Sequence, residues 1–491
     1  MGVSEKPGLL DNRLWAGKAF DGAWSTALST ARDVAEPATG QLFSRVGIAS
    51  AADMQAAVGR AQQAQAAWAA LGPRERAAVF HRAASIFEQH FDELALAIAR
   101  ETGGIVPKGQ HEVREAVTLC HLAAALPMQA QGQVLPSTPG RLSIARRVPH
   151  GVVGVISPFN FPLILGLRSV APALALGNAV VLKPDTRTPV SGGFIMARVF
   201  EEAGLPKGLL QVLPGDAEAG EALVVDERVP MIAFTGSPVV GRRIGALAGQ
   251  HLKKVSLELG GANNLIILED ADPDAAASAA AFGAWFHQGQ ICMAANRILV
   301  HESIADAILQ RLVGKATHLP VGDGASGQVA MGPMIDAKQL QRFDKVIQDS
   351  VAQGAKLEAG GSYDGLCYKP TVLSGVKPGI RSFDEEPFGP VANLVTFRTD
   401  DEAVQLANTS QGGLAAAVIS PSVGRAMAIG QRLRAGMVHI NDQTVNDECT
   451  NPFGGPGVGG NGGSVGGPAD IDEYTQWQWI TVKDAPPAFP F

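Results

Sequence analysis

One of the four cysteines, Cys292, lies in a segment suited to nucleophilic chemistry. The segment reads HQGQICMAANR (His287–Arg297), and a glycine-containing turn precedes the thiol. A helix beginning just beyond Cys292 would lower the thiol pKa from about 8.5 and favour the reactive thiolate. His287 could act as a base, although a histidine beside two aromatic residues is more often structural. Alternatively, Cys292 is an inert core residue.

Two more polar residues stand in apolar surroundings that suit catalysis. Glu258 lies in VSLELGG (Val255–Gly261), where partial burial would raise the pKa of its carboxyl toward the range of a general base. A salt bridge or a solvated position is the alternative for Glu258. Asn160 lies in VISPFNFP (Val155–Pro162), where its amide could stabilise an oxyanion or cap the following helix.

A phosphate-binding turn is a further candidate. The sequence FTGSPVVG (Phe234–Gly241) follows a strand-like run and opens a helical one. Gly236, Ser237 and the helix N-terminus could therefore bind a pyrophosphate. The turn is not GxGxxG, and a plain connection is the alternative. Glu386, in DEEPFGPV, could accept hydrogen bonds from ribose hydroxyls or face solvent on a surface turn.

Alternating strands and helices must position these residues. The strand-like runs are GVVGVIS, NAVVLKP, LLQVLPG, MIAFTGS and LIILEDA, with helical patterns such as residues 192–203 between them. This alternation predicts a parallel, doubly wound sheet with ligands at the strand ends, and its return after Cys292 predicts a second α/β unit. Residues 51–126 predict a helical layer, residues 132–148 a hairpin with an edge strand, and residues 451–467 a glycine-rich loop.

Composition limits the class of protein. A chain of 491 residues exceeds one ordinary core, and its 46% hydrophobic and 18% charged residues favour a well-buried α/β enzyme. The net charge is -7 and the sequence contains no block of basic residues, which argues against nucleic acid as a partner. No apolar run reaches the roughly 18 residues of a membrane span, and the N-terminus has no secretory pattern, so a cytoplasmic location is expected. The cysteine and histidine spacing suits neither structural disulfides nor a metal site.

Together, the motifs resemble those of the aldehyde dehydrogenase superfamily, nearly from EPATG (Glu36–Gly40) to the C-terminus. They are SPFNFP, LKPDTRTP, FTGS with Gly241, LELGG, GQIC, EEPFGPV and NPFGG. The resemblance implies an α/β fold with two doubly wound Rossmann-type domains and a small β oligomerisation element. It also implies oxidation of an aldehyde to a carboxylic acid through a thioester on Cys292, with Glu258 as general base and Asn160 as oxyanion donor.

The resemblance further implies a nicotinamide cofactor, NAD, with NADP as a second candidate. Lys183 would hold the adenosine ribose, the turn after Phe234 the pyrophosphate, and Glu386 with Phe388 the nicotinamide ribose and ring. The implied cofactor-binding residues are Ser157, Pro158, Phe159, Lys183, Gly215, Phe234, Gly236, Ser237, Gly241, Leu259, Gly260, Glu386 and Phe388.

Three residues depart from the superfamily pattern. Thr186 stands where NAD-preferring relatives often carry Glu, which removes repulsion against a 2'-phosphate, although the nearby Asp185 favours NAD. Ala262 replaces a common Lys, with no role that we can assign. Gly459 replaces the usual Ser of the terminal glycine-rich motif, which would loosen that loop.

The resemblance is strongest to the benzaldehyde dehydrogenases. It rests on HQGQICM together with HINDQTVNDE (His439–Glu448). Phe161 and Phe453 would form apolar walls of the aldehyde tunnel, and Ile291 and Met293 could line it as well. Aromatic walls alone do not distinguish an aromatic aldehyde from a medium aliphatic one.

The predicted organisation has four parts. They are a dinucleotide-binding domain (residues 1–131 and 149–257), a catalytic domain (258–441), a glycine-rich return segment near the active site (442–473), and an oligomerisation hairpin with a C-terminal strand (132–148 and 474–491). By resemblance, the hairpin and the strand would extend a partner subunit's sheet and give a homodimer or homotetramer.

Three other functions stay open. A cofactor-independent thiol esterase or acyltransferase would use Cys292 without needing FTGS or Glu386. An acylating dehydrogenase would transfer the thioester to coenzyme A and would not need Glu258 to activate water. A non-catalytic protein would keep only the fold, against which the intact Cys292, Glu258 and Asn160 weigh.

Overall fold

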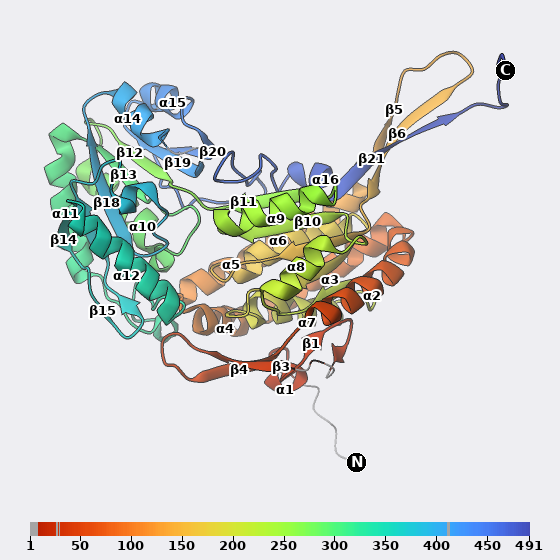
Figure 1. The fold of residues 1–491 in the computed structure, drawn as a ribbon, viewed down its shortest axis with the longest axis horizontal. Coiled ribbons are helices and arrows are strands. Elements are labelled where there is room, and N and C mark those ends of the chain that lie inside the picture. The colour runs from red at the N-terminus through yellow and green to blue at the C-terminus, as the bar shows by residue number, and fades with distance from the viewer. Residues whose placement is uncertain (1–7, 26–27, 29, 410–412) are drawn as a thin grey trace.

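The computed structural model has two α/β lobes and a thin β arm that projects from one of them (Figure 1). It describes residues 8–25, 28, 30–409 and 413–491. The N-terminal segment on which the cytoplasmic expectation rests lies partly outside these residues. Among the described residues, no helix is both long and apolar enough to span a membrane.

The first lobe is built on a seven-stranded sheet in the order β11-β10-β7-β8-β9-β1-β2. Its strands are β1 Ala19–Phe20, β2 Trp24–Ser25, β7 Val152–Ile156, β8 Ala179–Lys183, β9 Leu210–Val212, β10 Met231–Gly236 and β11 Lys254–Leu259. Strands β7 to β11 pair in parallel, and β1 joins β9 antiparallel. The predicted parallel sheet is confirmed, and the short strands β1 and β2 at one end of it are additions that the sequence did not reveal.

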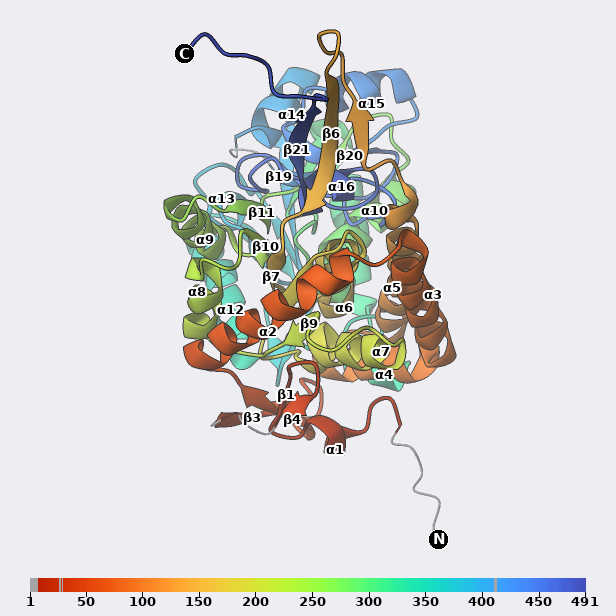
Figure 2. The same ribbon diagram turned by 90° about the vertical axis from the view of Figure 1, so that its right-hand side faces the viewer.

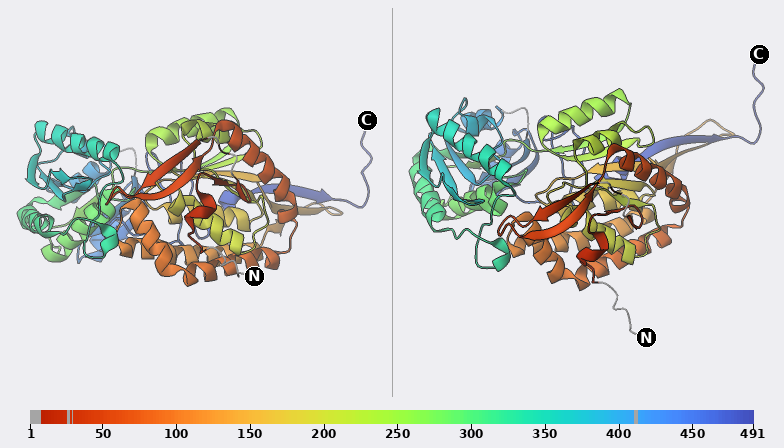
Figure 3. Two further views of the ribbon diagram at one scale, coloured as in Figure 1. Left: turned by 90° about the horizontal axis from the view of Figure 1, so that it is seen from below. Right: turned by 60° about the horizontal axis from the view of Figure 1, so that its bottom comes forward.

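Helices cover this sheet because its central strands are apolar on both faces, every residue of β7 being buried. The predicted helical layer comprises α2 Ala51–Ala69, α3 Pro73–Gln89, α4 Phe91–Thr102 and α5 Val106–Ala125; the other helices of this lobe are α1 Asn12–Trp15, α6 Pro162–Ala175, α7 Ile195–Glu202, α8 Ala217–Val225 and α9 Pro238–Gln250. Ser50 and Asp53 start α2 with a reciprocal capping box. A two-stranded hairpin, β3 Thr30–Ala35 with β4 Leu42–Ile48, lies on the surface of this lobe (Figure 3).

The second lobe confirms the predicted second α/β unit. Its sheet has the order β14-β17-β18-β13-β12-β19-β20. The strands are β12 Asn264–Ile267, β13 Arg297–His301, β14 Lys356–Ala359, β17 Thr371–Ser374, β18 Val391–Phe397, β19 Gly413–Ile419 and β20 Ala435–Ile440, and the helices are α10 Pro273–Trp285, α11 Ala305–His318, α12 Ala337–Ala352, α13 Arg381–Asp384, α14 Asp400–Ala407 and α15 Val423–Gly430. Five of the six strand pairs are parallel, and β14 joins β17 antiparallel.

The arm is a three-stranded sheet in the order β21-β6-β5, formed by β5 Gly132–Val134, β6 Leu142–Pro149 and β21 Thr475–Val482 (Figure 2). The predicted hairpin is therefore present. The expectation that its second strand lies at an edge is wrong, because β6 is paired on both sides. The C-terminal strand begins only at Thr475, after helix α16 (Ala469–Tyr474).

Two further segments bear on the predicted organisation. Residues 451–467 form a loop, as predicted, held by single bridge pairs such as Phe453 with Val465. Strand β11 of the first sheet carries both Glu258 and Leu259, so it continues past residue 257. The domain bounds themselves stay a prediction.

Candidate active site

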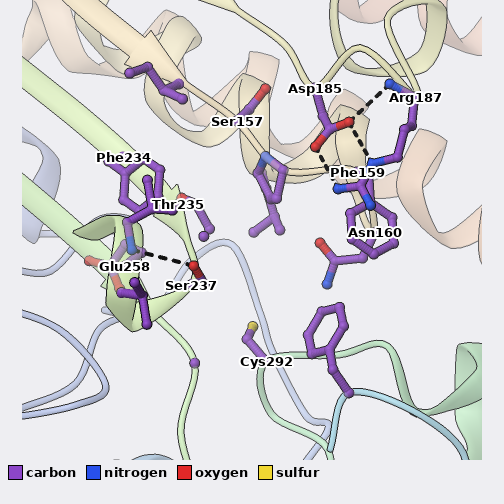
Figure 4. Close-up of a pocket in the computed structure, with 18 of the residues that line it drawn as sticks. Ser157, Phe159, Asn160, Asp185, Arg187, Phe234, Thr235, Ser237, Glu258 and Cys292 are labelled. Atoms are coloured by element: carbon purple, nitrogen blue, oxygen red, sulfur yellow. Dashed lines mark hydrogen bonds and ion pairs between the residues drawn. The ribbon is translucent and has the colours of Figure 1, made fainter. Parts of the chain in front are cut away.

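Cys292 lies in the walls of two adjoining cavities. The first has a volume of about 500 Å³ and is formed largely by the carboxyl ends of β7, β8 and β10, as a doubly wound sheet predicts. The second has a volume of about 120 Å³ and is mostly apolar. Figure 4 shows Cys292 below Asn160, with Glu258 on the other side of the first cavity. A thiol placed between two cavities can meet ligands from both.

The chain around Cys292 differs from the prediction. After the short 3-10 helix η3 (Phe286–Gly289), residues 290–296 are turn and coil, and β13 comes next. The expected helix N-terminus beyond Cys292 is therefore wrong. Burial raises the thiol pKa, and the nearby carboxylates of Glu386, Asp447 and Glu258 raise it further, while Arg168 acts in the opposite direction. The thiol consequently needs a base to take its proton.

His287 is not suited to be that base. Burial lowers the pKa of its imidazole well below the ordinary value, and Lys108 adds to this effect. The ring packs edge-on against Phe161, with 5.3 Å between ring centroids, and His287 is not among the residues lining either cavity. His287 and Gln288 have φ angles of 47° and 56°, a left-handed conformation that is costly for residues other than glycine.

Asn160 lies in the turn between β7 and α6 and is buried. Its Nδ2 donates a hydrogen bond of 2.9 Å to the backbone oxygen of Gln290, which ties the amide to the segment that carries Cys292. An amide NH₂ has two hydrogens, and Figure 4 shows the group turned toward Cys292. One hydrogen therefore stays available to an oxyanion beside the thiol.

A buried ion pair fixes the helix that comes after this turn. Glu112 of α5 accepts hydrogen bonds from the backbone N–H groups of Leu163 (2.9 Å) and Ile164 (3.2 Å), and so caps α6. Lys108, one turn earlier on α5, pairs with the same carboxylate, and both side chains are fully buried. The ammonium of Lys108 also lies 4.7 Å from the ring centroid of Phe161. The sequence did not reveal this pair, because both residues belong to an ordinary amphipathic helical pattern.

Glu258 is buried on β11, where its backbone pairs with Thr235 of β10. Within the described chain, neither carboxylate oxygen has a hydrogen-bond partner. Burial raises the pKa of Glu258 well above its ordinary value, partly offset by Arg168 and reinforced by Glu473 and Asp447. A buried carboxyl with no partner and a raised pKa has the properties of a general base.

Ten of the thirteen residues predicted to bind the cofactor line the first cavity. They are Ser157, Pro158, Phe159, Lys183, Phe234, Gly236, Ser237, Gly260, Glu386 and Phe388. Ser237 is the N-cap of α9 and accepts from the Val240 N–H at 3.5 Å, so the helix N-terminus opens at the cavity. The other three, Gly215, Gly241 and Leu259, are not among the lining residues. Their predicted role is untested.

Side chains at this cavity leave polar groups for a dinucleotide. Ser157 Oγ and Glu386 Oε1 are buried and have no hydrogen-bond partner among the described residues. Glu386 as a whole is partly exposed, but burial of its carboxyl raises the pKa to about 8, opposed by Arg342 and by the backbone of Gly261. A Cβ added at Gly260 would collide with the Glu386 carboxylate and displace it, so glycine leaves the carboxylate in its present position. These residues fit a nicotinamide dinucleotide.

Other lining residues of the first cavity were not predicted to bind the cofactor. Arg187 pairs with Asp185 (2.8 Å) and Asp336 (3.2 Å), and its guanidinium carbon lies 4.0 Å from the ring centroid of Phe159. In the sequence, Asp185 was used only to choose between NAD and NADP. Gln339 also lines the cavity. No motif in the sequence around Gln339 marks it, because most of the other lining residues are far away in sequence.

All four residues predicted for the substrate pocket line the second cavity, namely Phe161, Ile291, Met293 and Phe453. The lining residues that were not predicted are His111, Ile164, Leu165, Phe286, Val445, Asn446 and Asp447. Ile164 and Leu165 of α6, and Val445, could have been found only from the fold, because they are distant in sequence from Cys292. The described residues contain no cluster of three His, Cys, Asp or Glu side chains able to hold a metal ion.

Comparison with known proteins agrees with this geometry. The family model described as "Aldehyde dehydrogenase family" matches residues 24–480, and the chain belongs to this family. The chain is 52% identical over 483 residues to vanillin dehydrogenase of an Amycolatopsis species, covering 98% of this chain and 99% of that one. It is 47% identical over 479 residues to benzaldehyde dehydrogenase [NAD(+)] of Pseudomonas putida, covering 97% and 98%.

A solved structure extends the comparison to the fold. The salicylaldehyde dehydrogenase of Pseudomonas putida G7, complexed with salicylaldehyde, superposes with a TM-score of 0.93 at 34% identity, covering 97% of this chain and 99% of that one. The predicted superfamily, its fold and the similarity to benzaldehyde dehydrogenases are thereby confirmed.

Proposed function

We propose that the protein oxidises an aromatic aldehyde to the carboxylic acid with NAD, through a thiohemiacetal and then a thioester on Cys292. The observation that carries this proposal is the position of Cys292 in the walls of both cavities. The second cavity, of about 120 Å³, is near the size of the cavity of about 150 Å³ that holds benzene in another protein. Relatives named for vanillin, benzaldehyde and salicylaldehyde support an aromatic substrate.

The roles of the catalytic residues derive from their surroundings. Cys292 adds to the aldehyde carbon, and the amide of Asn160 stabilises the oxyanion that forms. After oxidation, Glu258 takes a proton from the water that hydrolyses the thioester, and the free thiol returns. A medium aliphatic aldehyde is the alternative substrate, since the apolar walls would accept it.

The first cavity suits NAD, which when bound supplies the hydride acceptor. Ser237 and the start of α9 would hold the pyrophosphate, Lys183 the adenosine ribose, and Glu386 with Phe388 the nicotinamide riboside. Thr186 leaves room for NADP as a second cofactor, although its hydroxyl accepts a hydrogen bond from Arg32, which also pairs with Asp216. A cofactor-independent esterase would have no use for this cavity.

The assembly and location extend this proposal. The arm exposes apolar side chains, including Val134, Leu142, Trp477, Trp479 and Val482, and these favour association through residues 132–148 and 474–491 into a homodimer or homotetramer. The two sheets support the four-part organisation predicted from the sequence. Four free cysteines fit a reducing, cytoplasmic location.

A panel of aldehydes tests the proposal. Benzaldehyde and medium aliphatic aldehydes are assayed with NAD and NADP in parallel, and we expect NAD-dependent turnover with the highest kcat/KM for aromatic aldehydes. Cys292→Ala should abolish turnover and keep NAD binding measurable by calorimetry. Normal turnover by that variant, or ester hydrolysis indifferent to NAD with no aldehyde oxidation, would contradict the proposal.

A further inference from the structure

One edge of the second cavity carries a carboxylate. Most of the cavity wall is apolar, but Asp447, on the segment after β20, also lines it, together with His111 and Asn446. The aldehyde carbon of a substrate must reach the thiol of Cys292 at the wall that the two cavities share. The aromatic ring and its substituents therefore extend into the rest of the second cavity.

Arg168 holds this carboxylate in place. Its Nη2 donates to both oxygens of Asp447, at 2.9 Å and 2.8 Å. The side chain of Arg168 is 2% exposed and that of Asp447 17%, so a ligand can reach the carboxylate but not the guanidinium. The guanidinium also lies 4.6 Å from the ring centroid of Phe453, which forms the cavity wall in front of it. Arg168 thus fixes Asp447 from behind the wall.

The carboxylate retains capacity to bind a donor. An ionised carboxylate is only an acceptor, and its two oxygens offer about four lone-pair sites. A single nitrogen of Arg168 contacts both oxygens, which leaves lone pairs directed elsewhere. In a mostly apolar cavity, these free lone pairs lose their water when a substrate enters, and a substrate without a donor leaves them unsatisfied at a cost.

We propose that Asp447, positioned by Arg168, accepts a hydrogen bond from a hydroxyl group on the ring of the substrate, so that the site selects hydroxylated benzaldehydes. The proposal rests on the proposed function and names the substrate class within it. A methoxy group of similar size has no hydrogen to donate, and an anionic ring substituent is repelled by the carboxylate. Arg168 is a positioning residue, because it does not touch the substrate.

The test compares kcat/KM for hydroxybenzaldehydes, the corresponding methoxybenzaldehydes and benzaldehyde, with NAD saturating. We expect the wild-type protein to prefer the hydroxy over the methoxy compounds about tenfold to 100-fold, the range of a hydrogen bond to a charged group. Asp447→Ala should reduce this preference to near unity. Glu448→Ala, which removes an exposed carboxylate one residue further along that does not line the cavity, should keep it.

Benzaldehyde separates this proposal from the proposed function. Benzaldehyde has no ring substituent, so its turnover reports only on the thiol, the base and the cofactor. The hydroxy and methoxy compounds use the same three groups, so any change in those groups cancels in the ratio of their kcat/KM values. If Asp447→Ala does not fold because Arg168 is left unpaired, the paired variant Arg168→Met with Asp447→Leu replaces both charges by apolar groups and should also lose the preference. Wild-type turnover without any preference, or a preference that survives in these variants, would overturn the role of Asp447. Absence of turnover with every aldehyde would instead refute the proposed function.

Discussion

The carboxyl of Glu386 gives NAD binding a pH dependence whose size depends on its surroundings. Burial raises its pKa to about 8, so about 1% of the protein has this carboxyl ionised at pH 6 and about 90% at pH 9. Ribose hydroxyls donate hydrogen bonds most strongly to the ionised form. The apparent Kd equals the intrinsic Kd divided by the competent fraction, so the Kd for NAD should fall by up to about 90-fold from pH 6 to pH 9.

Calorimetric titration of NAD at a series of pH values measures this effect without catalysis. Glu386→Gln should bind NAD more weakly at alkaline pH and lose most of the pH dependence. The matched control is Glu385→Gln, since Glu385 is exposed and pairs with Arg381 away from the cavity, and it should behave as wild type. A wild-type Kd that is flat across this range, or an equal slope in Glu386→Gln, would refute the reasoning.

Three further predictions concern catalysis, stability and assembly. Glu258→Gln should lose its base, so mass spectrometry during turnover should detect an acyl adduct on Cys292; a normal rate with no adduct would exclude Glu258 as the base. Lys108→Met breaks the buried pair with Glu112 and should lower the free energy of unfolding by about 3–5 kcal/mol, measured by urea denaturation, with partial recovery when Glu112→Gln is added. Trp479→Ser, at an exposed position on the arm, should weaken the oligomer in light scattering, and an unchanged mass would argue against the arm as an interface.

The sequence predicted those features of the site that are encoded locally. Strands β7 and β10 end in the motifs SPFNFP and FTGS, and in a parallel sheet the ends of such strands meet at one edge. Asn160 and Ser237 therefore could be assigned to one cavity before the fold was known. Glu258 was found as a carboxylate in an apolar run, and Cys292 as a thiol beside a glycine-containing turn.

The remaining features depend on contacts between distant segments. Arg168 lies in a helix that is buried on all sides, and its partner Asp447 is 279 residues away, so no local pattern marks the pair. The predicted helix after Cys292 was wrong because a glycine-containing turn indicates a change of direction but does not define the next element. Here the left-handed residues His287 and Gln288 form the turn, and the chain then enters β13 without an intervening helix.

The raised pKa values of Cys292 and Glu258 are best understood together. A thiol with a raised pKa would be a poor nucleophile if the carboxyl that takes its proton had an ordinary pKa, because the proton would have no favourable acceptor. Burial also raises the pKa of Glu258, which makes its carboxylate a better proton acceptor than one with an ordinary pKa. Arg168 lowers both pKa values, so its buried charge favours the ionised forms of both groups. Replacing Glu258 by Gln should therefore slow thiol attack as well as thioester hydrolysis, and the burst of product in the first turnover should be slower than in the wild type. A burst of unchanged rate would limit Glu258 to the hydrolytic step.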